Sequence, residues 1–130
     1  MIFDAHSDIW TDVLQKKQLG FSNIFEIYHK DRLQNSLITQ GVFTIWVDPP
    51  HDSNPQLRTL DMIRSLFEEM NNAHPFLRIV KSEQDFELAT SQNQFASIIG
   101  IEGLSSRGYS DEEIEKISYL NFRRVYKNVL

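Results

Sequence analysis

Cysteine is absent from the 130-residue sequence, and glycine and proline are scarce, with five and four residues. Without cysteine there can be no disulfide bonds, thiolate zinc sites or cysteine nucleophiles, and we expect a cytoplasmic protein. No apolar run approaches the roughly 18–20 residues that a membrane-spanning helix needs. A basic segment followed by an apolar one, which would mark a secretion signal, is also missing. We therefore expect no membrane partner.

Basic residues are outnumbered as well, because 13 Lys and Arg stand against 18 Asp and Glu and give a net charge of −5. This balance argues against a surface for nucleic acid, which would need an excess of positive charge. Hydrophobic residues make up 41% of the sequence, an ordinary value for a globular protein with a packed core. The length suits a single domain over residues 1–130.

Along the chain, short apolar runs alternate with segments of helical periodicity. Strands are predicted at residues 2–8, 37–47, 95–101 and 122–130, with a short extended piece at 77–80. Helices are predicted at residues 9–19 and 55–70, after Ser82, and after the capping box Ser110-x-x-Glu113. Such alternation is typical of an α/β fold whose parallel strands are joined by right-handed crossovers.

The clearest element is the helix that begins at Pro55, preceded by the capping residues Ser53 and Asn54. Apolar side chains recur along it at helical spacing. We expect this row to be the buried face of the helix: Leu57, Leu60, Ile63, Phe67 and Met70.

The first strand carries an unusual polar face. Asp4, His6 and Asp8 occupy alternate positions, so a regular strand would point all three the same way. Carboxylate and imidazole together suit Zn, Mn, Fe or Co. Glu102 follows the strand at 95–101, and the C-terminal ends of parallel strands meet at one edge, where α/β enzymes place their chemistry. The alternative is that Asp8 caps a helix and Glu102 only begins a turn.

Other ionisable residues are weaker candidates. Glu26 and His29 have the spacing of a surface pair, and His51 and His74 lie beside prolines where exposure is expected. The pair Arg123–Arg124 could bind an anion, but basic pairs after helices are common.

Four stretches resemble the renal (membrane) dipeptidases, the M19 metallopeptidases. FDAHSDI at residues 3–9 resembles the D-x-H-x-D-L opening of that family, and IIGIEG at 98–103 resembles its third-strand I-x-x-E-G. HKDRL at 29–33 with GVF at 41–43, and IVKSEQDF at 79–86, agree with segments between these two. Order and spacing fit over essentially the whole chain.

The resemblance implies a (β/α)8 TIM barrel of the metallo-dependent hydrolase type that hydrolyses dipeptides with two zinc ions and a bridging hydroxide. By position, His6 and Asp8 would bind the first zinc ion, and Glu102 would bridge both ions as the catalytic residue. Asp4 would orient a ligand by a hydrogen bond.

The chain also departs from the family. A complete barrel takes about 250 residues, so we expect an incomplete barrel domain, the N-terminal half with about four strands. The family's second-zinc histidines come later, and VYKN at 125–128 stands where the family tends to have LTHN or LTWN. We therefore expect at most one zinc ion here, no dipeptidase activity of the isolated chain, and a homodimer or association with the missing C-terminal half.

Two alternatives stay open. One is another amidohydrolase-type hydrolase acting on a cyclic amide or ester, although those usually open with H-x-H and Asp8 counts against it. The other is a non-catalytic α/β remnant that serves as an interaction module.

Overall fold

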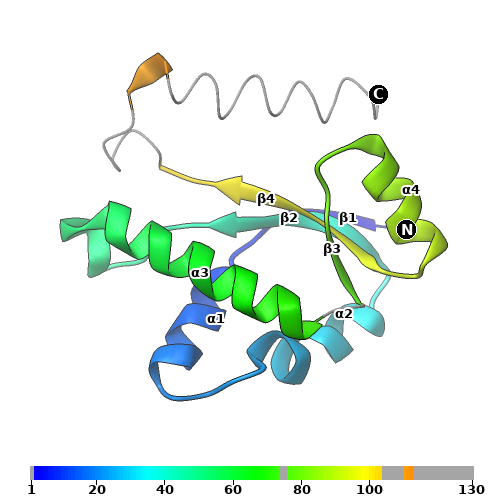
Figure 1. Cartoon of the computed structure of the whole chain (residues 1–130), viewed down its shortest axis with the longest axis horizontal. Helices are drawn as coiled ribbons and strands as arrows, with labels where there is room; N and C mark the ends of the chain where they lie inside the picture. Colours follow the sequence, from blue (N-terminus) through cyan, green and yellow to red (C-terminus); the bar gives the residue numbers. More distant parts are fainter. Residues whose placement is uncertain (1, 74–75, 104–109, 113–130) are drawn as a thin grey trace.

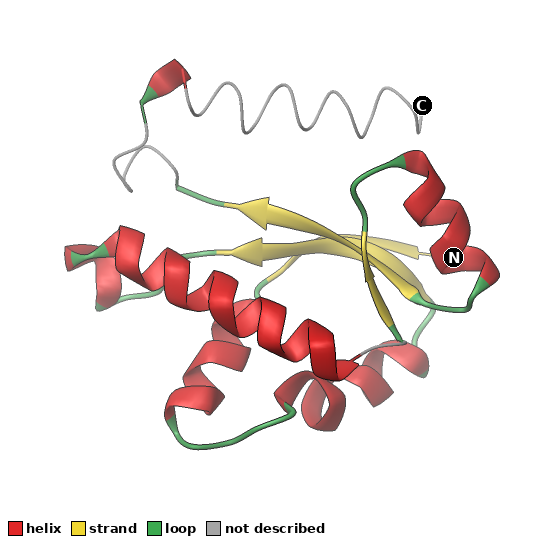
Figure 2. Cartoon of the chain, in the orientation of Figure 1, coloured by secondary structure: helices red, strands yellow, loops and turns green. Residues whose placement is uncertain are grey.

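The computed structural model describes residues 2–73, 76–103 and 110–112, in which strands and helices alternate as the sequence predicts (Figures 1 and 2). The strands are β1 (Ile2–Ser7), β2 (Ile38–Ile45), β3 (Leu77–Ile79) and β4 (Phe95–Ile101). The helices are α1 (Ile9–Gln18), α2 (Asp31–Gln34), α3 (Pro55–Ala73) and α4 (Glu83–Ser91), with a π-helical segment η1 (Phe25–Lys30) and a 3-10 turn η2 (His51–Ser53).

The strands form one sheet in the order β1-β2-β4-β3, and every pair is parallel. This confirms the predicted α/β class with four parallel strands. The fourth described strand is not the expected segment, however. Residues 122–130 lie outside the described part of the chain, and the edge beside β4 is taken by the short piece Leu77–Ile79.

Helices α1, α2 and α3 lie on one side of the sheet and α4 on the other (Figure 1). Odd-numbered residues of β2 and β4, such as Phe43 and Phe95, point to the first side, which we call the core face. Even-numbered residues of β4, such as Ala96, pack against α4 through Ala89, and we call this side the α4 face.

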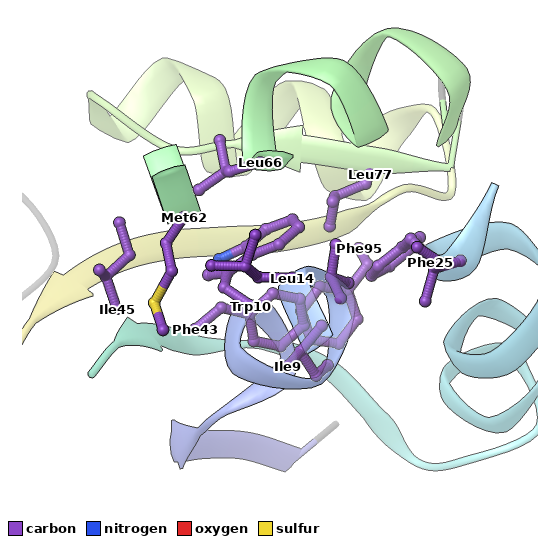
Figure 3. Close-up of a cluster of buried hydrophobic side chains, with 12 residues drawn as sticks. Ile9, Trp10, Leu14, Phe25, Phe43, Ile45, Met62, Leu66, Leu77 and Phe95 are labelled. Atoms are coloured by element: carbon purple, nitrogen blue, oxygen red, sulfur yellow. The ribbon is translucent and has the colours of Figure 1, made fainter. Parts of the chain in front are cut away.

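The main core is aromatic and lies between the core face and the helices (Figure 3). The Phe43 and Phe95 rings stack with their centroids 5.0 Å apart, and the Trp10 ring meets Phe43 edge-on at 6.0 Å. Offset and edge-to-face contacts of this kind add to the stabilisation from burial. This core holds β2 and β4, and hence their C-terminal ends, in a fixed relation to α1.

Helix α3 begins as predicted, with the Asn54 Oδ1 atom accepting a hydrogen bond from the Leu57 backbone N–H at 3.3 Å. Its predicted buried face is wrong at three positions, because Leu57, Leu60 and Phe67 are 50%, 49% and 60% exposed. The other two predicted residues, Ile63 and Met70, are half-buried and pack against the main core. The helix is buried through two apolar and four polar residues, namely Met62, Leu66, Arg58, Thr59, Ser65 and Glu69.

Partners elsewhere in the fold explain this burial of polar residues on α3. The carboxylate of Glu69 accepts a hydrogen bond from the Phe25 backbone N–H at 2.9 Å, and Arg58 pairs with Asp48. Burying a polar group is tolerated when it gains such a bond. No helix within residues 2–73, 76–103 and 110–112 combines the length and apolar character that crossing a membrane takes.

Candidate metal centre

The C-terminal ends of β1, β2 and β4 meet at one edge of the sheet. Ser7 pairs with Phe43, and Ile45 pairs with Ile101. The backbone N–H of Glu102 then donates to the Ile45 carbonyl at 3.0 Å, which continues the ladder one residue beyond β4. Because β2 lies between β1 and β4, the residues that follow β1 and β4 lie on either side of the end of β2.

His6, Asp8 and Glu102 come together at this edge. The Nε2 atom of His6 lies 3.1 Å from Asp8 Oδ1 and 3.9 Å from Glu102 Oε2. The three side chains are about half exposed, at 54%, 48% and 50%, so a ligand can reach them from solvent. The three candidate ligands, which the sequence analysis took from two separate motifs, thus lie side by side in the structure.

Asp8 stands at the N-cap position of α1, yet its side chain makes no capping hydrogen bond there. Its backbone carbonyl accepts the Thr11 N–H at 3.0 Å, while its carboxylate turns to His6. An aspartate at this position usually caps the helix with its carboxylate. The capping interpretation of Asp8 therefore does not describe this side chain, which is available to the cluster.

Asp4 does not lie in the same row as His6 and Asp8. Strand β1 leaves regular register between Asp4, which pairs with Gly41, and Ser7, which pairs with Phe43. Three steps along β1 thus match two along β2, which is a β-bulge. Since paired residues point the same way, the register directs Asp4 to the core face and His6 to the α4 face. The Asp4 Oδ1 atom accepts a hydrogen bond from the His6 backbone N–H at 3.2 Å.

Two solved structures share this architecture. One, a metallopeptidase of family M19 described as dipeptidase AC, matches with a TM-score of 0.68 and 14% identity over 81% of this chain and 37% of its own. The other, a metallopeptidase from Rhodobacter sphaeroides liganded with a phosphinate mimic of the dipeptide L-Ala-D-Ala, matches with a TM-score of 0.68 and 12% identity over 95% and 43%.

The chain has the fold of the M19 dipeptidases. Its four-stranded parallel sheet matches the N-terminal half of their TIM barrel, as the sequence resemblance implied. The chain spans about two fifths of the length of these two metallopeptidases. No protein-family model matches the sequence, and no curated protein matches it. At such low identity the likeness establishes the fold alone.

His6, Asp8 and Glu102 offer an imidazole nitrogen and carboxylate oxygens, which are ligand atoms that zinc accepts. Ligand atoms around a tetrahedral zinc ion lie about 3.4 Å from one another, between the two measured separations of 3.1 and 3.9 Å. As they lie, no group of three or more His, Asp or Glu side chains among the described residues is arranged to hold an ion. An ion would have to replace the His6–Asp8 hydrogen bond.

The sequence analysis missed one residue at the edge where the C-terminal ends of β1, β2 and β4 meet. Trp46 directly follows β2, between the ends of β1 and β4, and is 36% exposed although it is one of two tryptophans in the chain. Its carbonyl accepts a hydrogen bond from the Thr11 hydroxyl at 3.5 Å. A large aromatic residue straight after a buried strand was the available signal, because α/β folds present such positions to their ligands.

The two described histidines outside the centre, His29 and His51, differ from the prediction. His29 does not pair with Glu26, which contacts Lys30 instead. The His29 Nε2 atom lies 2.8 Å from Asp12 Oδ2, and the ring is only 12% exposed. Burial lowers the pKa of His29, and this effect outweighs the opposing influence of Asp12. His51 is half-buried in η2, and His74, Arg123 and Arg124 lie outside the described residues.

Proposed function

We propose that this chain carries the first-strand and third-strand zinc ligands of a metallo-dipeptidase. The observation that carries the proposal is the contact of His6 with both Asp8 and Glu102 at the C-terminal edge of a parallel sheet. The M19 fold supports it, because active sites of TIM barrels lie at this edge. That residues 1–130 form a single incomplete barrel domain stays a prediction.

Each residue has a distinct task in this proposal. His6 supplies a neutral imidazole nitrogen, while Asp8 and Glu102 supply negative charge that offsets the charge of a cation. Bound zinc would lower the pKa of a water molecule and polarise the scissile carbonyl. The resemblance to the M19 family makes Glu102, which directly follows β4, the residue that we propose would bridge toward a second ion. At most one zinc ion is expected on residues of this chain.

The proposed substrate is a dipeptide. The Rhodobacter sphaeroides metallopeptidase holds a mimic of L-Ala-D-Ala, which makes small dipeptides the first compounds to assay. Trp46 directly follows β2 and is partly exposed, and we propose that its ring contacts a substrate side chain. The remaining expectations also stay predictions, namely a cytoplasmic location and assembly as a homodimer or with a complementary barrel half.

A chimera tests the catalytic role. Residues 1–130 would replace the matching segment of the Rhodobacter sphaeroides enzyme, and hydrolysis of L-Ala-D-Ala would be measured with added zinc. We expect activity that falls by at least about 100-fold in a Glu102→Gln chimera and is retained in a Glu87→Gln chimera, where the charge removed lies on α4. A folded chimera without activity, or activity unaffected by Glu102→Gln, would contradict the proposal.

A non-catalytic interaction module is the second candidate, and one observation favours it. Leu57, Leu60 and Phe67 leave an apolar row exposed along α3, a feature that surfaces for protein partners often show. The two candidates differ in their response to metal. An interaction module would keep the same melting temperature with zinc and with a chelator, whereas a metal-binding chain melts higher with zinc.

A further inference from the structure

At the β-bulge in β1, the backbone N–H of His6 donates its hydrogen bond to a side chain. Among the described residues β1 pairs on one side only, with β2, and its register with β2 slips between Ile2 and Phe3 and again between Asp4 and Ser7. The extra residue of a bulge falls out of the ladder, and its N–H needs another acceptor. The Asp4 carboxylate provides one, because its Oδ1 atom accepts the His6 N–H at 3.2 Å.

Gly41 makes this arrangement possible. A Cβ atom at residue 41 would lie 2.7 Å from the Asp4 carbonyl oxygen and 3.0 Å from the Asp4 Cβ. Any side chain there would push β1 away or displace Asp4. The absence of a side chain on β2 therefore lets Asp4 sit against the neighbouring strand while its carboxylate turns back to the main chain at His6.

The imidazole points away from the face that Asp4 occupies. The register with β2 slips between Ile2 and Phe3 and, in the opposite sense, between Asp4 and Ser7, so the second slip restores the register of Ile2. The bulge therefore turns Asp4 to the core face, while His6 lies on the α4 face with its Nε2 atom 3.1 Å from Asp8. Whatever stabilises the bulged main chain at His6 consequently stabilises the direction of its ring.

We propose that Asp4 is a positioning residue whose carboxylate holds the bulged main chain at His6 and thereby orients the imidazole toward Asp8 and Glu102. The contact runs through the backbone N–H of His6, so Asp4 acts on the ligand's place in the strand. This differs from a carboxylate that orients a histidine through its ring nitrogen. The inference rests on the proposed metal function.

The test measures zinc binding to the 130-residue chain by calorimetry, and the visible absorption of bound Co²⁺, in four variants. Asp4→Ala removes the acceptor, and Asp4→Glu keeps the charge but carries its oxygens one methylene further. Asp4→Asn retains an oxygen at the same place. Glu87→Gln on α4 is the matched control for loss of an acidic charge. Urea unfolding and hydrogen exchange of the His6 amide are followed in the metal-free chain.

We expect Asp4→Ala and Asp4→Glu to bind zinc about 10 to 100-fold more weakly and to alter the Co²⁺ spectrum, because losing such supporting contacts usually costs this much. Asp4→Asn and the control should stay within about threefold of wild type. The His6 amide should exchange faster in Asp4→Ala. If Asp4→Ala does not fold, the zinc affinity of Asp4→Glu tests the same hydrogen bond.

Two results would overturn the inference. One is wild-type zinc affinity in both Asp4→Ala and Asp4→Glu, and the other is a loss in Asp4→Asn as large as in Asp4→Ala, which would make charge and not the hydrogen bond decisive. His6→Ala separates this outcome from failure of the proposed function. Unchanged zinc affinity in His6→Ala would contradict the metal site itself. Weaker zinc binding in His6→Ala together with wild-type affinity in the Asp4 variants would contradict only the positioning role of Asp4.

Discussion

Arg58 holds Asp48 through both oxygens of the carboxylate. Its Nε atom donates to Oδ1 at 2.9 Å and its Nη2 atom to Oδ2 at 3.0 Å, and the two side chains are only 3% and 8% exposed. Gln15 donates to the same carboxylate at 3.0 Å. The pair thus joins α1, α3 and the segment after β2, close to the edge that carries the candidate metal centre.

Breaking this buried pair should strongly destabilise the fold. Asp48→Ala leaves the Arg58 guanidinium buried without its partner, so we expect the free energy of unfolding to fall by about 3–5 kcal/mol. The exposed pair Asp61–Arg64 on the same helix is the control, and Asp61→Ala should cost less than about 1 kcal/mol. Urea unfolding followed by circular dichroism measures both, and equal losses would contradict the role given to the buried pair.

The same pair should shape the acid limb of the stability curve. Burial alone would raise the pKa of Asp48, but hydrogen bonds from Gln15 and Arg58 outweigh it and hold the pKa below its ordinary value. The contribution of the ionised carboxylate is therefore complete above about pH 4 and is lost as the pH falls through the lower pKa of the folded state. Asp48→Asn should flatten this limb.

Truncating two adjacent residues on α3 should change the free energy of unfolding by very different amounts. Leu66 is 3% exposed and contacts the core, so Leu66→Ala should cost about 2–5 kcal/mol of unfolding free energy. Phe67 is 60% exposed, and Phe67→Ala should change it by no more than about 1 kcal/mol. Chemical denaturation of the two variants compares them directly. A larger loss of unfolding free energy in Phe67→Ala than in Leu66→Ala would contradict this assignment and support the buried face predicted from the sequence.

His29 should titrate below its ordinary range. Burial lowers its pKa more than the neighbouring Asp12 raises it, so the folded state favours the neutral ring. Stability from this ring is complete above about pH 6.5 and is lost as the pH falls toward the pKa of the folded state. NMR titration of the imidazole should show a further drop in Asp12→Asn, where the raising influence is removed. A pKa above 6.5 in the wild type would refute the assignment.

The alternation of strands and helices, and the meeting of His6 with Glu102, could be foreseen from the sequence. Both follow from local patterns, because the apolar run that ends at Ile101 fixes where Glu102 emerges from a parallel sheet. Distance along the chain does not matter once two residues are known to follow neighbouring parallel strands.

Two features could not be foreseen, because they depend on partners far away in the sequence. The bulge at Asp4 becomes visible only in the register with Gly41, since the alternation of residues 4 to 8 by itself indicates a regular strand. The buried face of α3 is set by Arg58 and Glu69, whose burial is made possible by Asp48 and the Phe25 N–H. Hydrophobic periodicity predicts that such polar residues are exposed.

Zinc titration of the chain by calorimetry tests the central claim most directly. We expect the wild type to bind one zinc ion per chain, with affinity at least about 100-fold weaker in His6→Ala, because a ligand is removed. His51→Ala, a histidine in η2, serves as the matched control and should bind as the wild type does. Equal zinc affinity in the wild type and in His6→Ala would contradict the assignment of His6, Asp8 and Glu102 as metal ligands.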